Sequence, residues 1–383
     1  MTRSVTDIDL RGKRVFIRVD FNVPIKNGTI GDDTRIRASL PTIQYAIEQG
    51  AKTILLASHL GRPKGKPNPE YSLRPVAARL SELLGQPVTF DDPAANGVVL
   101  LENLRFNPGE ETNDPAFAAQ LAAMADVYIN DAFGSAHRAH ASTAGIVKHV
   151  KDAGAGLLMA AEVEYLSRVL ESPGRPFVAI LGGAKVSDKL EVIQNLVPRV
   201  DALLIGGAMA YTFFKARGLD VGTSLVEEDL LDAAREVEEL ARKRRLRFEL
   251  PVDHVVAPKL EAGSPAEILD VDDPAIGDRM GLDIGPKTIE RYRDIIRTAK
   301  TVTWNGPMGV FEIDAFARGT LEVARAVADV DGTTVIGGGD SIAAVAKAGV
   351  TDRITHISTG GGASLEFLGG QTLPGVEALN RRN

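Results

Sequence analysis

Four short apolar runs in the first 140 residues each end in a cluster of polar side chains. The runs start at Val15, Thr53, Val98 and Val127, are rich in Val, Ile and Leu, and lie about 30–45 residues apart. Runs of this length and composition are typical of parallel strands that are buried on both faces. In an open parallel sheet, ligands bind just beyond the carboxyl ends of the strands. The four runs therefore predict a parallel sheet whose polar residues gather along one edge.

Helical patterns separate these runs. Residues 36–49 and 73–84 follow the first two runs, and a third pattern opens at Pro115, a residue that suits the first turn of a helix. Strands that alternate with helices form a doubly wound α/β domain. A long helical pattern at 156–171 follows, and the alternation then starts again at Phe177. We predict an α/β fold of two doubly wound, Rossmann-like parallel-sheet domains joined by a helical hinge.

The polar residues at the strand ends of the first half are mostly basic. They are Asp20, Asn22, His59, Arg62, Arg105 and Arg138, together with His137, His140 and the loop residue Arg35. The whole chain carries a formal net charge of -7, so this cluster is not part of a general basic excess. Convergent arginines bind carboxylate and phosphate groups. The first half therefore predicts a site for a small, highly anionic ligand.

The strand-like runs of the second half end mostly in glycine. Four of the five end in two or three consecutive glycines, and the fifth ends in Asn305-Gly306-Pro307. Glycine at a strand-to-helix turn lets a ligand approach the backbone, and helix-start N–H groups favour phosphate. Lys185 and Lys189 would share one face if they were helical and could contact phosphates. Asp340 follows three glycines, where a carboxylate can hold Mg²⁺ on a nucleotide.

Composition narrows the class of protein further. A chain of 383 residues that is 44% hydrophobic can build two cores, and the lack of cysteine excludes disulfides, thiolate metal sites and a cysteine nucleophile. No apolar stretch approaches the ~20 residues of a membrane span, and the first residues show no apolar signal segment. An acidic chain with 5% aromatic residues is a poor candidate for nucleic-acid binding. We expect a cytoplasmic protein that binds neither membranes nor nucleic acid.

Two other functional classes stay open on the residues alone. A nicotinamide oxidoreductase would need a G-x-G-x-x-G turn after a strand, which the sequence lacks, as it lacks a Walker-type phosphate loop. A non-catalytic anion-binding protein could use the same basic cluster, but it would not need Lys185 and Asp340 beside glycine-rich turns. His137 and His140 have a metal-like spacing, but the arginine between them and the lack of cysteine disfavour zinc.

Ten motifs, in order along the chain, resemble those of the phosphoglycerate kinase family, and of its bacterial members in particular. They are RVDFNVP (18–24), SHLGRP (58–63), LLENLRF (100–106), INDAFGSAHRAH (129–140), ILGGAKVSDK (180–189), LLIGGAMAYTF (203–213), GLDIGP (281–286), WNGPMGVFE (304–312), GGGDS (337–341) and STGGGASLE (358–366). The resemblance implies a domain at 1–153 for 3-phosphoglycerate or 1,3-bisphosphoglycerate and a domain at 154–369 for Mg-ADP or Mg-ATP. It also implies that a tail at 370–383 packs back on the first domain.

The resemblance assigns residues to each site. Its phosphoglycerate-binding residues are Asp20, Asn22, Arg35, His59, Arg62, Arg105 and Arg138. Its nucleotide-binding residues are Gly182, Gly183, Lys189, Gly206, Gly207, Gly281, Asn305, Glu312, Gly338, Gly339, Asp340 and Ser341. The groups that steady the transferring phosphoryl are Arg35, Lys185, Gly360, Gly361 and Gly362. Glu312 would hydrogen-bond the ribose, and Asp340 would hold Mg²⁺.

The implied reaction moves the acyl phosphate of 1,3-bisphosphoglycerate to Mg-ADP, giving 3-phosphoglycerate and ATP. The leaving group is a carboxylate, a weak base that needs no general acid. A site rich in Arg, Lys and Gly suits such chemistry, because in-line positioning and charge stabilisation are then sufficient. With one substrate on each domain, the resemblance also implies hinge closure, and it implies a monomer.

Overall fold

The chain folds into two compact units. The computed structural model describes residues 3–380; unit 1 ends at Leu166 and resumes at Thr372, and unit 2 lies between these positions in the sequence. The boundary at which unit 1 first gives way to unit 2 falls inside helix α4 (Leu157–Glu171). The sequence predicts a domain boundary between residues 153 and 154. The helical pattern predicted at 156–171 corresponds to α4.

Unit 1 is built on a six-stranded sheet in which all neighbouring strands are parallel, in the order β5-β6-β4-β1-β7-β8. The strands are β1 (Arg14–Arg18), β4 (Thr53–Ala57), β5 (Val88–Phe90), β6 (Gly97–Leu100), β7 (Val127–Asn130) and β8 (Asp152–Ala155). β1 lies between β4 and β7 and is buried along four of its five residues, as expected for a strand covered on both faces. The four predicted strands are confirmed as β1, β4, β6 and β7.

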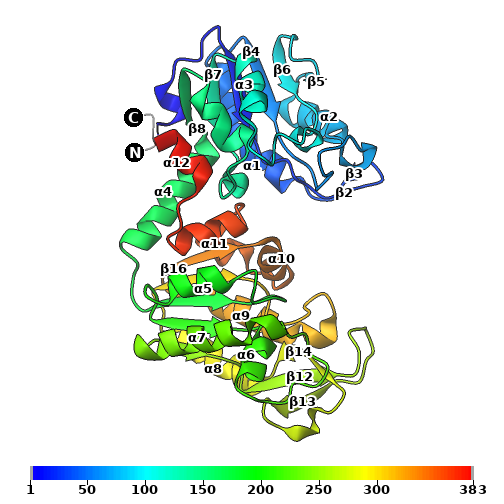
Figure 1. Cartoon of the computed structure of the whole chain (residues 1–383), viewed down its shortest axis with the longest axis vertical. Coiled ribbons are helices and arrows are strands. Elements are labelled where there is room, and N and C mark those ends of the chain that lie inside the picture. The colour runs from blue at the N-terminus through cyan, green and yellow to red at the C-terminus, as the bar shows by residue number, and fades with distance from the viewer. Residues whose placement is uncertain (1–2, 381–383) are drawn as a thin grey trace. The chain divides into compact units, whose positions relative to one another are not determined.

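Helices and one short hairpin complete unit 1. They are α1 (Thr34–Glu48), α2 (Arg74–Leu84), α3 (Pro115–Ala123), α12 (Pro374–Asn380) and the hairpin of β2 (Ile25–Lys26) and β3 (Thr29–Ile30). In α1 the buried residues Ile36, Ile43 and Ala46 repeat at helical spacing and pack into the same hydrophobic core as the strands of unit 1. Helix α12 contacts β8, although it comes from the far end of the chain (Figure 1). Residues 1, 2 and 381–383 of the expected first domain and its tail lie outside the described residues.

Unit 2 repeats the parallel architecture and adds a small antiparallel sheet. Its six-stranded parallel sheet has the order β11-β10-β9-β15-β16-β17, and the second sheet has the order β13-β12-β14. The strands are β9 (Phe177–Leu181), β10 (Ala202–Ile205), β11 (Arg247–Glu249), β12 (Asp253–Ala257), β13 (Glu267–Asp270), β14 (Met280–Ile284), β15 (Thr301–Asn305), β16 (Thr333–Gly337) and β17 (His356–Ser358). The predicted fold class, two parallel-sheet α/β domains, is confirmed, whereas the small antiparallel sheet is an addition that the sequence pattern did not predict.

The helices of unit 2 follow the glycine-rich strand ends. They are α5 (Leu190–Leu196), α6 (Ala210–Ala216), α7 (Leu231–Lys243), α8 (Pro286–Ile296), α9 (Arg318–Ala328), α10 (Gly339–Lys347) and α11 (Gly362–Leu368). The single tryptophan of the chain, Trp304, lies in β15 and is fully buried in the core that the sheet shares with α8 and α9. Its indole N–H donates to the carbonyl of Gly306 at 2.7 Å. Trp304 is therefore a natural fluorescence probe for the folding of unit 2.

One buried carboxylate joins the small sheet to α8. Asp253, at the start of β12, is fully buried and accepts hydrogen bonds from the backbone N–H groups of Lys287 (2.9 Å) and Thr288 (2.8 Å). It also accepts from the Thr288 hydroxyl at 2.6 Å. The first N–H groups of a helix have no partner within the helix, so a distant carboxylate that caps them stabilises both elements.

We predict that Asp253→Ala lowers the free energy of unfolding of unit 2 by about 3 kcal/mol, because it leaves buried N–H donors without an acceptor. Asp270 is the matched control. It pairs with Asp253 in the strand register, but its carboxylate is exposed and forms a surface ion pair with Lys287, so Asp270→Ala should cost less than about 1 kcal/mol. Urea titrations followed by Trp304 fluorescence measure both values. Equal losses of unfolding free energy would show that the buried Asp253 carboxylate contributes no more to stability than the exposed Asp270 carboxylate.

Candidate functional site

A buried arginine lies at the centre of the strand ends of unit 1. Arg18, the last residue of β1, is fully buried. Its Nε donates to the Ser142 hydroxyl at 2.8 Å, and its Nη2 lies 3.2 Å from Nδ1 of His59. A guanidinium group always carries its charge, so this position places a permanent positive charge beneath the surface of the site. Arg18 was not predicted as a site residue, because nothing in the sequence indicates that an arginine at the end of an apolar run is buried.

The loop after β1 joins this centre to α1. Arg35, in the first turn of α1, donates to the carboxylate of Asp20 at 3.1 Å and to the carbonyl of Asn22 at 3.2 Å. The side-chain carbonyl of Asn22 accepts the backbone N–H of Gly61 at 2.9 Å, which fixes the loop after β4. The structure therefore brings these predicted residues together through direct hydrogen bonds.

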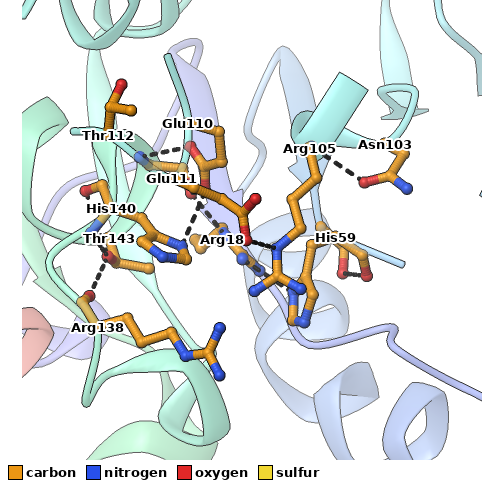
Figure 2. Close-up of polar contacts among 12 residues, drawn as sticks. Arg18, His59, Asn103, Arg105, Glu110, Glu111, Thr112, Arg138, His140 and Thr143 are labelled. Carbon is orange, nitrogen blue, oxygen red and sulfur yellow. Dashed lines mark hydrogen bonds and ion pairs between the residues drawn. The ribbon is translucent and has the colours of Figure 1, made fainter. Parts of the chain in front are cut away.

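Two further arginines come from the loops after β6 and β7 (Figure 2). Arg105 is buried, donates to the carbonyl of Gly61 at 2.8 Å and lies 3.3 Å from the carboxylate of Glu111. Arg138 is half-buried, and its Nε donates to Nε2 of His137 at 3.1 Å. Arg62 is exposed, and among the described residues it makes no hydrogen bond or ion pair, so the structure does not draw it into this network.

We call Arg18, Arg35, Arg105, Arg138, His59, His137 and His140 the cationic cluster. Burial lowers the pKa of His59 well below its usual range, and the nearby charges of Arg18 and Arg105 lower it further. Burial, followed by the charges of the same two arginines, lowers the pKa of His140 to about 4. These histidines are neutral at neutral pH, and the net positive charge of the cluster comes from its arginines. Such a site is suited to an anion with several charged oxygens.

Two buried residues that the sequence analysis missed support the cationic cluster from behind. Glu110 and Ser142 are both fully buried. Glu110 accepts the Ser142 hydroxyl at 2.5 Å and the Ser142 backbone N–H at 3.0 Å, and it lies 3.8 Å from Nδ1 of His140. Glu110 lies in a turn and Ser142 in a single π-helical turn (Ala141–Gly145), and neither segment has a hydrophobic periodicity that would mark these residues as interior.

Unit 2 has a pocket of about 520 Å³ at the ends of its central strands. Five predicted residues line it: Gly183, Gly207, Gly281, Glu312 and Asp340. Its other walls are largely apolar, and they include Tyr211 and His254, whose side chains form a 2.9 Å hydrogen bond, and the buried Asp283, whose pKa burial raises to about 7. None of these three was predicted as a site residue. An apolar pocket with a few polar groups suits a ligand that has both a flat ring and polar substituents.

Polar side chains lie at one end of this region. Lys189 donates to the side-chain carbonyl of Asn305, and the Ser341 hydroxyl accepts the backbone N–H of Gly306 at 2.6 Å. Burial lowers the pKa of Lys189, whereas the nearby charges of Asp188 and Asp340 raise it. Three predicted residues, Lys189, Asn305 and Ser341, are thus connected to the turns that follow β9, β15 and β16.

Lys185 and Lys189 would share a face only in a helix, and the structure shows that they are not helical. Helix α5 begins at Leu190, so both lysines lie in the loop after β9. Lys185 is exposed, whereas Lys189 is half-buried. This loop consists of bends and turns, and one of its turns is closed by the hydrogen bond from the Lys189 N–H to the carbonyl of Val186 at 2.8 Å. Lys185 is therefore an exposed point charge, while Lys189 is held by Asn305.

The glycines of unit 2 fall into two groups, although the sequence analysis attributed all of them to ligand approach. A Cβ on Gly182 would lie 2.1 Å from the carbonyl oxygen of Pro307, and one on Gly206 would lie 2.3 Å from Sδ of Met308. A Cβ on Gly339 or Gly362 would meet no protein atom within 4 Å. Packing of the chain on itself therefore explains the first pair, whereas the second pair leaves open space at the first residue of α10 and of α11.

The glycine-rich turn after β17 offers backbone donors. The N–H of Gly360 already donates to the Ser358 hydroxyl at 3.1 Å. Gly361 has a φ of +52°, a conformation that glycine adopts without strain, and the next residue, Gly362, starts α11. Of the three predicted glycines in this turn, Gly361 and Gly362 are the ones whose N–H groups make no hydrogen bond within residues 3–380.

In residues 3–380, no group of three or more His, Asp or Glu side chains is placed to hold a metal ion. Within the same range, no helix is both long enough and apolar enough to cross a membrane.

One parallel-sheet unit with a cationic cluster and another with a partly glycine-lined pocket define a two-unit α/β protein with two chemically different candidate ligand sites. The family model described as phosphoglycerate kinase matches residues 5–371. A phosphoglycerate kinase of Solibacter usitatus is 58% identical over 394 residues, and one of Rubrobacter xylanophilus is 58% identical over 392 residues. The alignments cover 99% of this chain in both cases, and 99% and 98% of the two relatives.

Solved structures give the same result. Phosphoglycerate kinase from Coxiella burnetii matches with a TM-score of 0.88 and 45% identity over 100% of both chains. The enzyme from Pyrococcus horikoshii matches with a TM-score of 0.84 and 37% identity over 99% of this chain and 98% of that chain. The chain belongs to the phosphoglycerate kinase family. It is therefore an enzyme and a kinase, and the resemblance noted from its motifs is confirmed.

We predict opposite effects for alanine at the two kinds of glycine. Gly182→Ala should destabilise unit 2 by about 1–3 kcal/mol, because its Cβ would overlap backbone atoms. Gly339→Ala should leave stability unchanged or raise it by up to about 1 kcal/mol, because alanine favours a helix, but it should weaken ADP binding by placing a methyl group in open space. Urea titration and calorimetry with Mg-ADP measure both effects. Wild-type affinity in Gly339→Ala would remove this position from the ligand site.

Proposed function

We propose that this protein catalyses the reversible transfer of the acyl phosphate of 1,3-bisphosphoglycerate to ADP, giving 3-phosphoglycerate and ATP, a reaction of glycolysis and gluconeogenesis. Family membership supports the reaction. The observation that supports it in this chain is the cationic cluster, in which four arginines from four separate segments, one of them the first turn of α1, lie together with neutral histidines. A ligand with a phosphate and a carboxylate at its two ends matches this spread of charge.

The glycerate substrate is assigned to unit 1. The proposed ligand residues are Asp20, Asn22, Arg35, His59, Arg62, Arg105 and Arg138. Arg105 and Arg138 offer planar groups that can bind oxygens in pairs, and the neutral His59 offers a hydrogen bond without further charge. Arg62 is exposed, so it would join the ligand from the solvent side.

The nucleotide is assigned to unit 2. The proposed ligand residues are Gly182, Gly183, Lys189, Gly206, Gly207, Gly281, Asn305, Glu312, Gly338, Gly339, Asp340 and Ser341. The apolar walls of the pocket suit the base, and the exposed Glu312 at its lining suits a ribose hydroxyl. Gly182 and Gly206 would act indirectly, since packing against Pro307 and Met308 sets their positions.

The donors of unit 2 fit Mg²⁺ that arrives with a nucleotide. Asp340 is exposed, lines the pocket and lies close enough to Lys189 to raise its pKa. A single carboxylate beside phosphates is a common protein contribution to a magnesium site. Asp340 would hold the ion, and Mg²⁺ would neutralise charge on the phosphates when bound.

The chain needs no proton-transfer residue for this reaction, because the carboxylate of the glycerate is an ionised nucleophile in one direction and a stable leaving group in the other. Its own groups would align the reactants and stabilise the charge on the transferring phosphoryl. We assign this role to Arg35, to Lys185 and to the backbone of Gly360, Gly361 and Gly362. The hydrogen bond from Gly360 to Ser358 leaves Gly361 and Gly362 as the better donors.

Assigning one substrate to each unit has a mechanical consequence. Direct transfer requires the two bound substrates to meet, so we expect hinge closure at the connector 154–171 and at the turn 358–362, which also keeps water away from the phosphoryl group. We further expect a cytoplasmic monomer that binds no nucleic acid and no membrane. The lack of cysteine suits a reducing compartment.

A coupled assay with 3-phosphoglycerate, ATP and Mg²⁺ tests the function directly. The wild type should turn over, and Lys185→Ala should lower kcat far more than it weakens nucleotide binding, because we assign this exposed ammonium to the phosphoryl group in transit. Lys243→Ala, an exposed lysine of α7 that pairs with Glu239, is the matched control and should behave as wild type. Equal losses of kcat and nucleotide affinity would assign Lys185 to ground-state binding, and no turnover by the wild type would contradict the proposed function.

Arg35→Ala should lower kcat by ~10³-fold while unit 1 stays folded, by analogy with arginines that meet transition-state charge. Arg35 forms its hydrogen bonds to Asp20 and Asn22 at the surface of the cluster. Removing its side chain should therefore leave the hydrophobic core of unit 1 unchanged. Arg37→Ala removes an exposed arginine on the same helix that pairs with Asp33, and it should keep wild-type kcat. A near-normal kcat in Arg35→Ala would refute the catalytic assignment.

A further inference from the structure

Three buried side chains of unit 1 are linked in series behind the cationic cluster. Glu110 precedes α3, Ser142 lies in the π-helical turn Ala141–Gly145, and Arg18 ends β1; all three are fully buried. The Ser142 hydroxyl lies 2.5 Å from Glu110 and 2.8 Å from Nε of Arg18. Figure 2 shows the Arg18 guanidinium between Glu110 and His59. We call Glu110, Ser142 and Arg18 the Glu110 relay.

The direction of each hydrogen bond in the relay is fixed by chemistry. A guanidinium group only donates, so the Ser142 oxygen accepts from Arg18. The single hydroxyl proton of Ser142 is then available for Glu110, whose other oxygen accepts the Ser142 backbone N–H at 3.0 Å. The remaining nitrogens of Arg18 are also committed, since Nη1 donates to the carbonyl of Val19 and Nη2 to His59. The guanidinium therefore has one orientation.

That orientation decides which nitrogen of His59 carries the proton. Arg18 Nη2 lies 3.2 Å from His59 Nδ1, and because arginine cannot accept, Nδ1 must present its lone pair. Burial and the surrounding arginines lower the pKa of His59 well below its usual range, so the ring holds a single proton. The proton is then on Nε2, which makes no hydrogen bond to another described residue and is available to a ligand.

A second histidine of the cluster shows the opposite arrangement. Arg138 Nε donates to Nε2 of His137 at 3.1 Å, so in His137 it is Nε2 that presents the lone pair. Burial and the charge of Arg138 lower the pKa of His137, so its single proton lies on Nδ1. Two neighbouring arginines thus impose different tautomers on two histidines, and only His59 depends on the Glu110 relay.

We propose that Glu110 is a positioning residue that, through Ser142 and Arg18, holds His59 as the Nε2–H tautomer and so gives the glycerate site a neutral hydrogen-bond donor. The opposite tautomer would turn a lone pair toward an anionic oxygen and repel it. A protonated ring would add yet another charge to a buried cluster of arginines. The identity of the ligand rests on the proposed function, whereas the tautomer does not.

The carboxylate of Glu110 also balances the charge of Arg18. A buried arginine without a nearby acidic group is strongly destabilising, and a carboxylate reached through one hydroxyl reduces that effect. His140 cannot take over from Arg18 as the partner of Glu110, because it lies 3.8 Å away and its pKa is lowered to about 4, which leaves it neutral. Removing the Ser142 hydroxyl should therefore release the Arg18 guanidinium from its single orientation. His59 would then lose the contact that fixes its tautomer.

The first test is a nitrogen-15 NMR measurement of the histidine tautomers in the whole wild-type protein at neutral pH, without substrate. Long-range proton–nitrogen couplings distinguish a protonated from an unprotonated ring nitrogen. His59 should carry its proton on Nε2 and His137 on Nδ1. A proton on Nδ1 of His59, or on both of its nitrogens, would overturn the proposal, and this result would be independent of whether the protein is a kinase.

The second test removes the relay. Ser142→Ala should turn His59 into a mixture of tautomers, leave His137 unchanged, and raise KM for 3-phosphoglycerate about tenfold with KM for ATP unaltered. The matched control is Ser81→Ala, which also removes a hydroxyl bonded to backbone groups in unit 1, away from the cluster. Changes in both histidines, or changes that the control reproduces, would assign the effect to general loosening and overturn the proposal.

Glu110→Gln provides the test if Ser142→Ala fails to fold. Glutamine keeps one oxygen that can accept the Ser142 hydroxyl, but it replaces the other acceptor of the relay with an N–H donor. Compared with the wild type, His59 should therefore hold a smaller fraction of the Nε2–H tautomer, and KM for 3-phosphoglycerate should rise, by less than tenfold. An unchanged tautomer together with unchanged KM would contradict the relay. If the wild type lacked kinase turnover but showed the expected tautomers, the proposed function would fail while the relay would stand.

Discussion

Placing the guanidinium of Arg18 inside unit 1 requires acceptors for its nitrogens, and this requirement shapes the surrounding loops. Each of its three nitrogens has a partner, and these partners come from Val19, His59 and Ser142; Ser142 is in turn held by Glu110. Four segments that are distant in sequence are thereby fixed relative to one another behind the surface of the site. The arginines at that surface then face a ligand on a rigid support, which is the arrangement that electrostatic catalysis needs.

Unit 2 meets a different requirement, because it must bring backbone close to a ligand without leaving gaps in its own packing. Gly182 and Gly206 allow the strand ends to pack against Pro307 and Met308, and these contacts set the shape of the pocket. Gly339 lies in open space at the start of α10. Glycine thus allows close internal packing at Gly182 and Gly206, whereas at Gly339 it leaves open space. Only the structure distinguishes these two roles.

Much of the fold and part of the site could be predicted from the sequence, since buried parallel strands have a strong pattern and the residues that follow them gather at one edge. Asp20, Asn22 and Arg105 were predicted in this way, and the structure places all three in segments that follow strands of unit 1. Arg18 and Glu110 were not predicted, because burial of a charged residue depends on partners that are remote in the chain. Lys185 and Lys189 do not share a helical face, because α5 starts only at Leu190. The antiparallel sheet of unit 2 was missed because its strands lack a clear alternation of buried and exposed residues.

The central claim is that each unit binds one substrate at its own strand ends. Amide hydrogen exchange, read by mass spectrometry with each ligand added alone, tests it most directly. With 3-phosphoglycerate, protection should appear in segments 18–22, 59–62, 105–112 and 138–143 of unit 1; with Mg-ADP, it should appear in 182–189, 305–312 and 338–341 of unit 2. Protection of the same unit by both ligands, or none in unit 1 with 3-phosphoglycerate, would contradict the account.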